Sequence, residues 1–125
     1  MNVIDSSGWL EYFTNGENAA FFAPAIEDPE NVLVPTISLF EVFKRVLIER
    51  NRDDALEAIA IMKGGRVVEL DDSLALLAAE LSYELKLPLA DSIILATARE
   101  GNATLWTQDA HFKGLDGVKY IEKND

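Results

Sequence analysis

The stretch that decides the fold is Asn2-Val3-Ile4-Asp5-Ser6-Ser7, near the start of the chain. It is a short apolar run that ends in an acid and leads directly into a helical pattern over residues 6–13. Short runs rich in Val, Ile and Leu recur along the chain and alternate with longer segments of helical period. This alternation predicts an α/β fold with a parallel sheet, in which the first run is the central strand.

Five strands and the helices between them follow from this pattern. We expect strands at residues 2–5, 32–35, 66–70, 103–107 and 118–121. Apolar residues at helical spacing predict helices at residues 6–13, 17–26, 36–50, 52–63, 71–85 and 88–99, with a short helical turn at 110–113. Thr36 and Asp71 are expected N-terminal caps, and Gly64-Gly65 and Gly101 mark helix ends. Without linkers or internal repeats, we expect residues 1–125 to form a single domain.

The composition excludes several classes of protein. Hydrophobic residues make up 49 % of the chain and charged residues 26 %, which is typical of a globular protein and not of a disordered tail. The chain has no cysteine and a single histidine, which excludes disulfides and cysteine nucleophiles and disfavours a Ser-His-Asp triad. No apolar run approaches the ~20 residues that span a bilayer, so we expect a cytoplasmic protein with no membrane partner.

The chain is strongly acidic, with 22 Asp and Glu against 11 Lys and Arg and a formal net charge of −11. This charge argues against nonspecific adhesion to nucleic acid or anionic lipid. Two explanations stay open, namely solubility and a carboxylate cluster that binds a hard cation.

Two acids stand at the ends of predicted strands. Asp5 ends the first strand, and Asp109 follows the fourth. In parallel α/β sheets, ligands bind outside the carboxyl ends of the strands, where the strand order reverses. Each acid alone could instead cap the helix that follows it. Capping does not predict two such acids on neighbouring strands, so we favour a functional role for the pair.

Two further acids lie in apolar helical segments. Asp91 is in or near the first turn of its helix, and it is either a ligand or a favourable partner of the helix dipole. Glu41 has Lys44 and Arg45 on its own helical face, so a surface ion pair is the ordinary alternative for it. A role for Glu41 in a shared site therefore depends on the other three acids lying close by.

Taken together, these motifs resemble those of the PIN-domain ribonucleases, and especially the VapC toxins of bacterial and archaeal toxin–antitoxin pairs. Val3-Ile4-Asp5-Ser6-Ser7 is similar to the family's opening motif, and the segment Thr36–Val42 around Glu41 to its second acidic motif. The segment Leu89–Ala98 is similar to the third motif, and Leu105–Phe112 to the fourth. The resemblance covers nearly the whole chain, with four motifs in order.

The resemblance implies a three-layer, PIN-like α/β sandwich with a mostly parallel five-stranded sheet whose acids meet in one pocket. It implies Mg²⁺ or Mn²⁺ as cofactor and endonucleolytic cleavage of RNA by the toxin of a toxin–antitoxin pair. A homodimer and a VapB-type antitoxin are the implied partners. The catalytic and metal-binding residues on this hypothesis are Asp5, Glu41, Asp91 and Asp109.

Other residues complete the predicted site. Thr107 is expected to orient Asp109. The basic residues that are candidates for contact with RNA phosphates or the antitoxin fall within nine residues: Lys44, Arg45, Arg50 and Arg52. The alternative for these bases is a solvated face balanced by nearby acids. The residues to which we assign no chemistry are His111, Trp9 and Trp106.

Two rival interpretations stay open. A receiver-like signalling module is also a small acidic α/β domain, but it would show paired acids after its first strand, and Asp5 has no acidic neighbour. The second rival is a catalytically silent PIN-like module that binds only a protein partner.

Overall fold

The computed structural model describes residues 1–124, and its elements follow the order that the sequence predicts. The strands are β1 (Asn2–Ile4), β2 (Val32–Pro35), β3 (Arg66–Val68), β4 (Thr104–Thr107) and β5 (Val118–Tyr120). The helices are α1 (Ser6–Phe13), α2 (Ala19–Ile26), α3 (Thr36–Glu49), α4 (Arg52–Met62), α5 (Asp72–Leu85) and α6 (Leu89–Glu100). Two 3₁₀ turns are η1 (Pro29–Asn31) and η2 (Ala110–Phe112). Among residues 1–124, no helix is both long enough and apolar enough to cross a bilayer.

The five strands form one sheet in the order β3-β2-β1-β4-β5, and every pair is parallel. β1 is the central strand, as predicted, with Val3 opposite Leu33 of β2 and Leu105 of β4. The chain moves outward from β1 to β3 and then returns to the other side of β1, so the strand order reverses between β1 and β4. This switch point is where parallel sheets bind ligands. Receiver domains have the strand order 2-1-3-4-5, so the topology excludes that rival.

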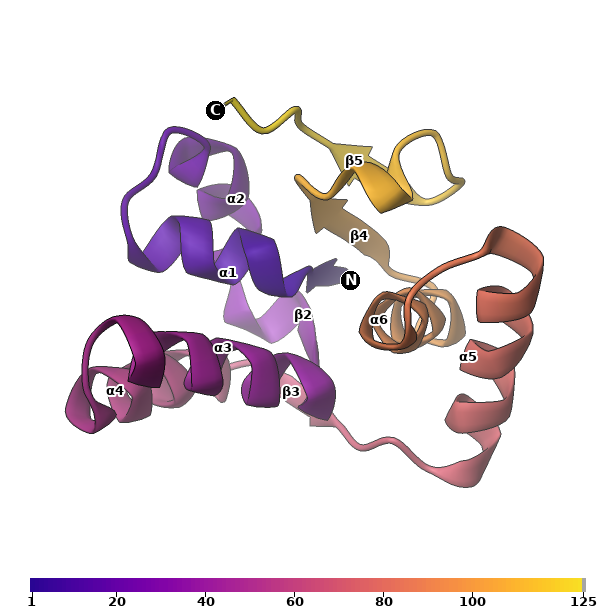
Figure 1. Ribbon diagram of the computed structural model, residues 1–125, viewed down its shortest axis with the longest axis horizontal. Coiled ribbons are helices and arrows are strands. Elements are labelled where there is room, and N and C mark those ends of the chain that lie inside the picture. The colour runs from indigo at the N-terminus through magenta and orange to yellow at the C-terminus, as the bar shows by residue number, and fades with distance from the viewer. Residues whose placement is uncertain (125) are drawn as a thin grey trace.

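Helices cover both faces of the sheet, with α1 to α4 on one side and α5 and α6 on the other (Figure 1). Neighbouring strand residues face opposite layers. Val3 and Leu105 pack with α5 and α6, whereas Ile4 and Val34 pack with α1 to α4. The three-layer α/β sandwich is therefore confirmed.

Most predicted boundaries differ from the observed ones by one or two residues. β3, for example, ends at Val68, two residues before the predicted end. Thr36 is not the N-cap of α3, because it is already the first helical residue and Pro35 occupies the cap position. Asp71 does cap α5, since its side chain accepts a hydrogen bond from the N–H of Leu74 at 2.8 Å.

Candidate functional site

Asp5 lies at the carboxyl end of β1, directly at the switch point, and only 3 % of it is exposed. Its Oδ2 accepts hydrogen bonds from Ser7 Oγ at 2.7 Å and from Thr107 Oγ1 at 3.0 Å. Asp5 occupies the N-cap position of α1, but its side chain accepts no capping hydrogen bond within residues 1–124. The capping alternative is wrong for Asp5, and its carboxylate is held by hydroxyl groups.

Thr107 joins the ends of the two central strands. Its Oγ1 donates to the Asp5 carboxylate and accepts a hydrogen bond from the backbone N–H of Asp109 at 2.9 Å. The prediction has Thr107 orienting Asp109, but the side chain that it contacts is that of Asp5. Asp109 caps η2, because its Oδ1 accepts a hydrogen bond from the N–H of His111 at 2.9 Å. The capping alternative therefore holds for Asp109, through one carboxylate oxygen.

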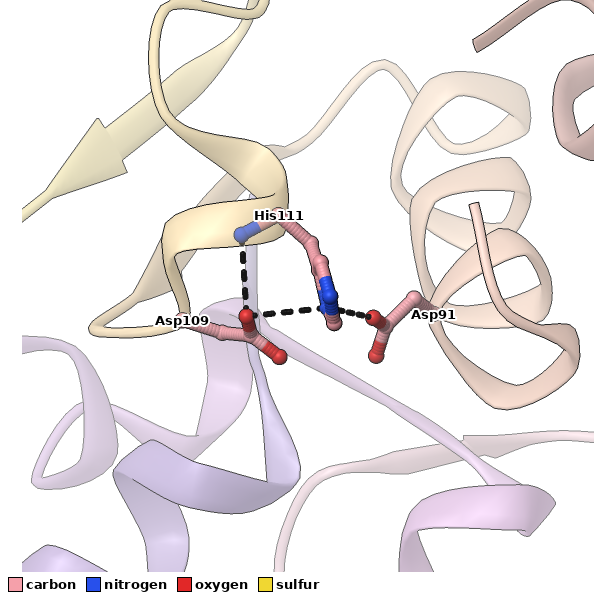
Figure 2. Close-up of side chains that lie close together, drawn as sticks. All are labelled: Asp91, Asp109 and His111. Atoms are coloured by element: carbon pink, nitrogen blue, oxygen red, sulfur yellow. Dashed lines mark hydrogen bonds and ion pairs between the residues drawn. The ribbon is translucent and has the colours of Figure 1, made fainter. Parts of the chain in front are cut away.

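Asp91 lies in the first turn of α6, and the side chain of His111 contacts the carboxylates of both Asp91 and Asp109. Nδ1 of His111 is 2.9 Å from Asp91 Oδ2 and 3.1 Å from Asp109 Oδ1 (Figure 2). One donor atom from each of the three residues lies within 4.8 Å of the other two. The sequence reasoning missed His111, and the only local signal was its place two residues after a strand-end acid, in a short turn.

Glu41 reaches the same region from α3. Its Oε1 accepts a hydrogen bond from Ser6 Oγ at 2.7 Å. Within the described part of the chain it forms no ion pair with its helical neighbours. Arg45 pairs with Glu49 at 3.5 Å, and the Lys44 ammonium lies 5.8 Å from the centre of an aromatic ring. The predicted alternative for Glu41, a surface ion pair, is wrong.

The four acids described above line one open pocket of about 480 Å³, whereas Thr107 and His111 are not part of its lining. Lys44 and Arg45 also line this pocket, so they are the basic residues placed to meet a ligand. Arg50 and Arg52 do not line it, and Arg50 instead lies 3.8 Å from the Asp54 carboxylate, as a solvated face would predict. The predicted site acids in the pocket wall are Asp5, Glu41, Asp91 and Asp109.

Burial and neighbouring charges shift the pKa values of several ionisable groups at this site. The pKa of Asp5 is raised to about 6, mainly by burial and to a smaller extent by the charges of Asp91 and Asp109, while the hydrogen bonds from Ser7 and Thr107 oppose the rise. Burial also raises the pKa of Asp91, and the charge of Asp109 adds to this effect. In turn, the carboxylate of Asp109 and the hydrogen bond to Asp91 raise the pKa of His111. The pocket therefore favours a bound positive charge.

A divalent cation fits this donor set. Within residues 1–124, both side-chain hydrogen bonds to Asp5 arrive at Oδ2, and those to Asp109 arrive at Oδ1. One oxygen of each carboxylate is thus left for a ligand. Carboxylate oxygens are the donors that Mg²⁺ and Mn²⁺ prefer. Among residues 1–124, the donor atoms that lie close enough together to hold one ion belong to Asp91, Asp109 and His111, while Asp5 and Glu41 line the adjoining pocket.

An all-parallel five-stranded sheet with an acidic pocket at its switch point is the arrangement that the resemblance to PIN domains implies. The profile of the PIN-domain family matches residues 3–118, so the chain belongs to this family. No curated protein sequence gives a significant match.

Solved structures share the fold over almost the whole chain. A toxin–antitoxin complex from Klebsiella pneumoniae matches with a TM-score of 0.80 and 23 % identity, over 95 % of this chain and 96 % of that chain. VapC20 from Mycobacterium tuberculosis, described as a sarcin–ricin loop cleaving toxin, matches with a TM-score of 0.75 and 18 % identity, over 93 % of this chain and 95 % of that chain. DNA-bound VapBC from Salmonella typhimurium matches with a TM-score of 0.76 and 14 % identity, over 97 % of this chain and 96 % of that chain. At these identities the likeness shows the fold.

Proposed function

We propose that this protein is a metal-dependent endoribonuclease that hydrolyses RNA phosphodiester bonds as the toxin of a toxin–antitoxin pair. One observation carries the proposal: four carboxylates from separate elements line a single pocket at the switch point. Membership of the PIN-domain family and a fold shared with the toxin VapC20 support the ribonuclease and toxin roles.

Each residue of the pocket has a role in this proposal. Asp5, Asp91 and Asp109 would hold Mg²⁺ or Mn²⁺, and Glu41 would complete the donor set or orient a water molecule. The chemistry that such an ion would supply is activation of water and neutralisation of negative charge on the scissile phosphate. Thr107 and Ser7 hold the Asp5 carboxylate in the direction of the pocket, which keeps this donor in place before the ion binds. No nucleophilic side chain is needed.

Two basic side chains at the edge of the acidic pocket would help a polyanion to approach this acidic protein. Lys44 and Arg45 line the pocket, so they are the residues that we expect to contact RNA phosphates. A basic segment of a VapB-type antitoxin would instead bind the carboxylates of the pocket. An Arg guanidinium among the carboxylates would take the place of the cation and block the site. We further propose that the toxin is a homodimer and acts in the cytoplasm.

The test is cleavage of a structured RNA by the purified chain with Mg²⁺ or Mn²⁺. We expect Asp5→Asn and Asp91→Asn to lose at least tenfold in rate and EDTA to abolish cleavage. Asp116→Asn is the matched control, because it removes the same charge from an exposed position outside the pocket. Cleavage that survives EDTA would refute the mechanism. A wild-type protein that binds the ion but never cuts RNA would favour the silent interaction module.

A further inference from the structure

His111 places a ring nitrogen beside two of the pocket's carboxylates, those of Asp91 and Asp109. It is the single histidine of the chain and lies in η2, two residues after Asp109. Its own N–H donates to Asp109 Oδ1 at 2.9 Å, so the carboxylate beside the ring also fixes the turn that carries it. Although 57 % of the side chain is exposed, Nδ1 points between the carboxylates of Asp91 and Asp109, which come from different elements (Figure 2).

The spacing of these atoms fits hydrogen bonds in the metal-free protein and also fits two donors around one ion. Two ligands bound at about 2.1 Å and at right angles to each other are about 3.0 Å apart. Nδ1 of His111 is 2.9 Å from Asp91 Oδ2 and 3.1 Å from Asp109 Oδ1. One donor atom from each of Asp91, Asp109 and His111 lies within 4.8 Å of the other two, so the three side chains can share an ion.

We propose that Nδ1 of His111 is a direct ligand of the metal centre and shifts its preference from Mg²⁺ toward later first-row ions such as Co²⁺. A neutral imidazole with its proton on Nε2 carries a lone pair on Nδ1. Oxygen donors suit Mg²⁺ and Mn²⁺, whereas imidazole suits the later transition metals. This inference rests on the proposed metal site. It adds one ligand to that site and a preference among divalent ions.

Calorimetric titration of tag-free protein with Mg²⁺ and Co²⁺ separates a ligand from a positioning residue. The variant is His111→Gln, whose amide still donates a hydrogen bond but offers no imidazole; Asp116→Asn is the control. We expect the affinity for Co²⁺ to fall about tenfold or more in His111→Gln while that for Mg²⁺ changes much less. A residue that only positions the two carboxylates would weaken both ions by the same factor, which would overturn the inference.

A spectroscopic measurement gives a second readout that needs no activity. In Mn²⁺-loaded protein, pulsed electron paramagnetic resonance should detect imidazole nitrogen coupled to the ion, and this signal should disappear in His111→Gln. Because the chain has one histidine, the signal has one possible imidazole source. Mn²⁺ binding without nitrogen coupling overturns the inference and leaves the carboxylate site standing. A wild-type protein that binds none of the three ions overturns both this inference and the proposed function.

Discussion

Asp5→Asn should stabilise the metal-free protein at neutral and alkaline pH. The pKa of Asp5 is raised from 3.8 to about 6, mainly by burial. At about 1.36 kcal/mol per pH unit, this difference makes the charged carboxylate cost about 3 kcal/mol of folding free energy. Asn removes the charge, and its Oδ1 still accepts hydrogen bonds from Ser7 and Thr107. We therefore expect a gain of up to about 3 kcal/mol at pH 8.

The pH dependence of this gain follows from the direction of the pKa change. Below pH 3.8 both the folded and the unfolded protein hold the proton, so the charge costs nothing. As the pH rises, the unfolded state ionises first, and the full destabilisation of the wild type is reached only above pH 6. The advantage of Asp5→Asn should therefore shrink to about 1 kcal/mol at pH 4.5.

Urea unfolding in EDTA at pH 4.5 and pH 8 measures this difference, with Asp116→Asn as the control for loss of an exposed charge. Adding Mg²⁺ should narrow this difference in stability. At ten times its dissociation constant the ion adds about 1.4 kcal/mol to the wild type, and it should add less to Asp5→Asn. An Asp5→Asn protein that is no more stable than the wild type at pH 8 in EDTA, or equally favoured at both pH values, would refute the reasoning.

Three further outcomes test the same site. Thr107→Val keeps the shape of the side chain but removes its hydrogen bond to Asp5, so urea unfolding should show a loss of about 1–2 kcal/mol and calorimetry weaker Mg²⁺ binding. In EDTA, an NMR titration of His111 should give a pKa above 6.5, and saturating Mg²⁺ should lower it because the ion neutralises the neighbouring carboxylates. Lys44→Ala should weaken RNA binding and flatten its salt dependence, whereas Arg52→Ala, outside the pocket, should change both much less; equal effects would contradict the proposed RNA path.

The sequence predicted the fold well because its signals are local. Apolar runs bounded by turn residues locate the strands, and caps such as Asp71 locate helix starts to within one residue. The failure at Thr36 is also local. A capping side chain must precede the first helical residue, but Pro35 already fills that position, and the sequence pattern did not separate the two.

The site was less predictable, because its contacts join residues that are far apart in sequence. The convergence of Asp5 and Asp109 follows from parallel topology alone, so the strand ends were enough to suggest it. Ser6, by contrast, donates to Glu41 across 35 positions, and His111 reaches Asp91 across 20. These contacts depend on how α1 faces α3 and how η2 faces α6, which no periodicity along the chain encodes.

The repulsion within the pocket links metal binding, inhibition and stability. Burial raises the pKa values of Asp5 and Asp91, and the neighbouring carboxylates raise them further by repulsion. Any cation that enters relieves this repulsion, whether it is a metal ion or the guanidinium of a proposed antitoxin. Both occupants should therefore stabilise the protein, and they should compete for the same carboxylates. On the proposed function, a bound antitoxin protects the toxin from unfolding by the same interaction that withholds its metal.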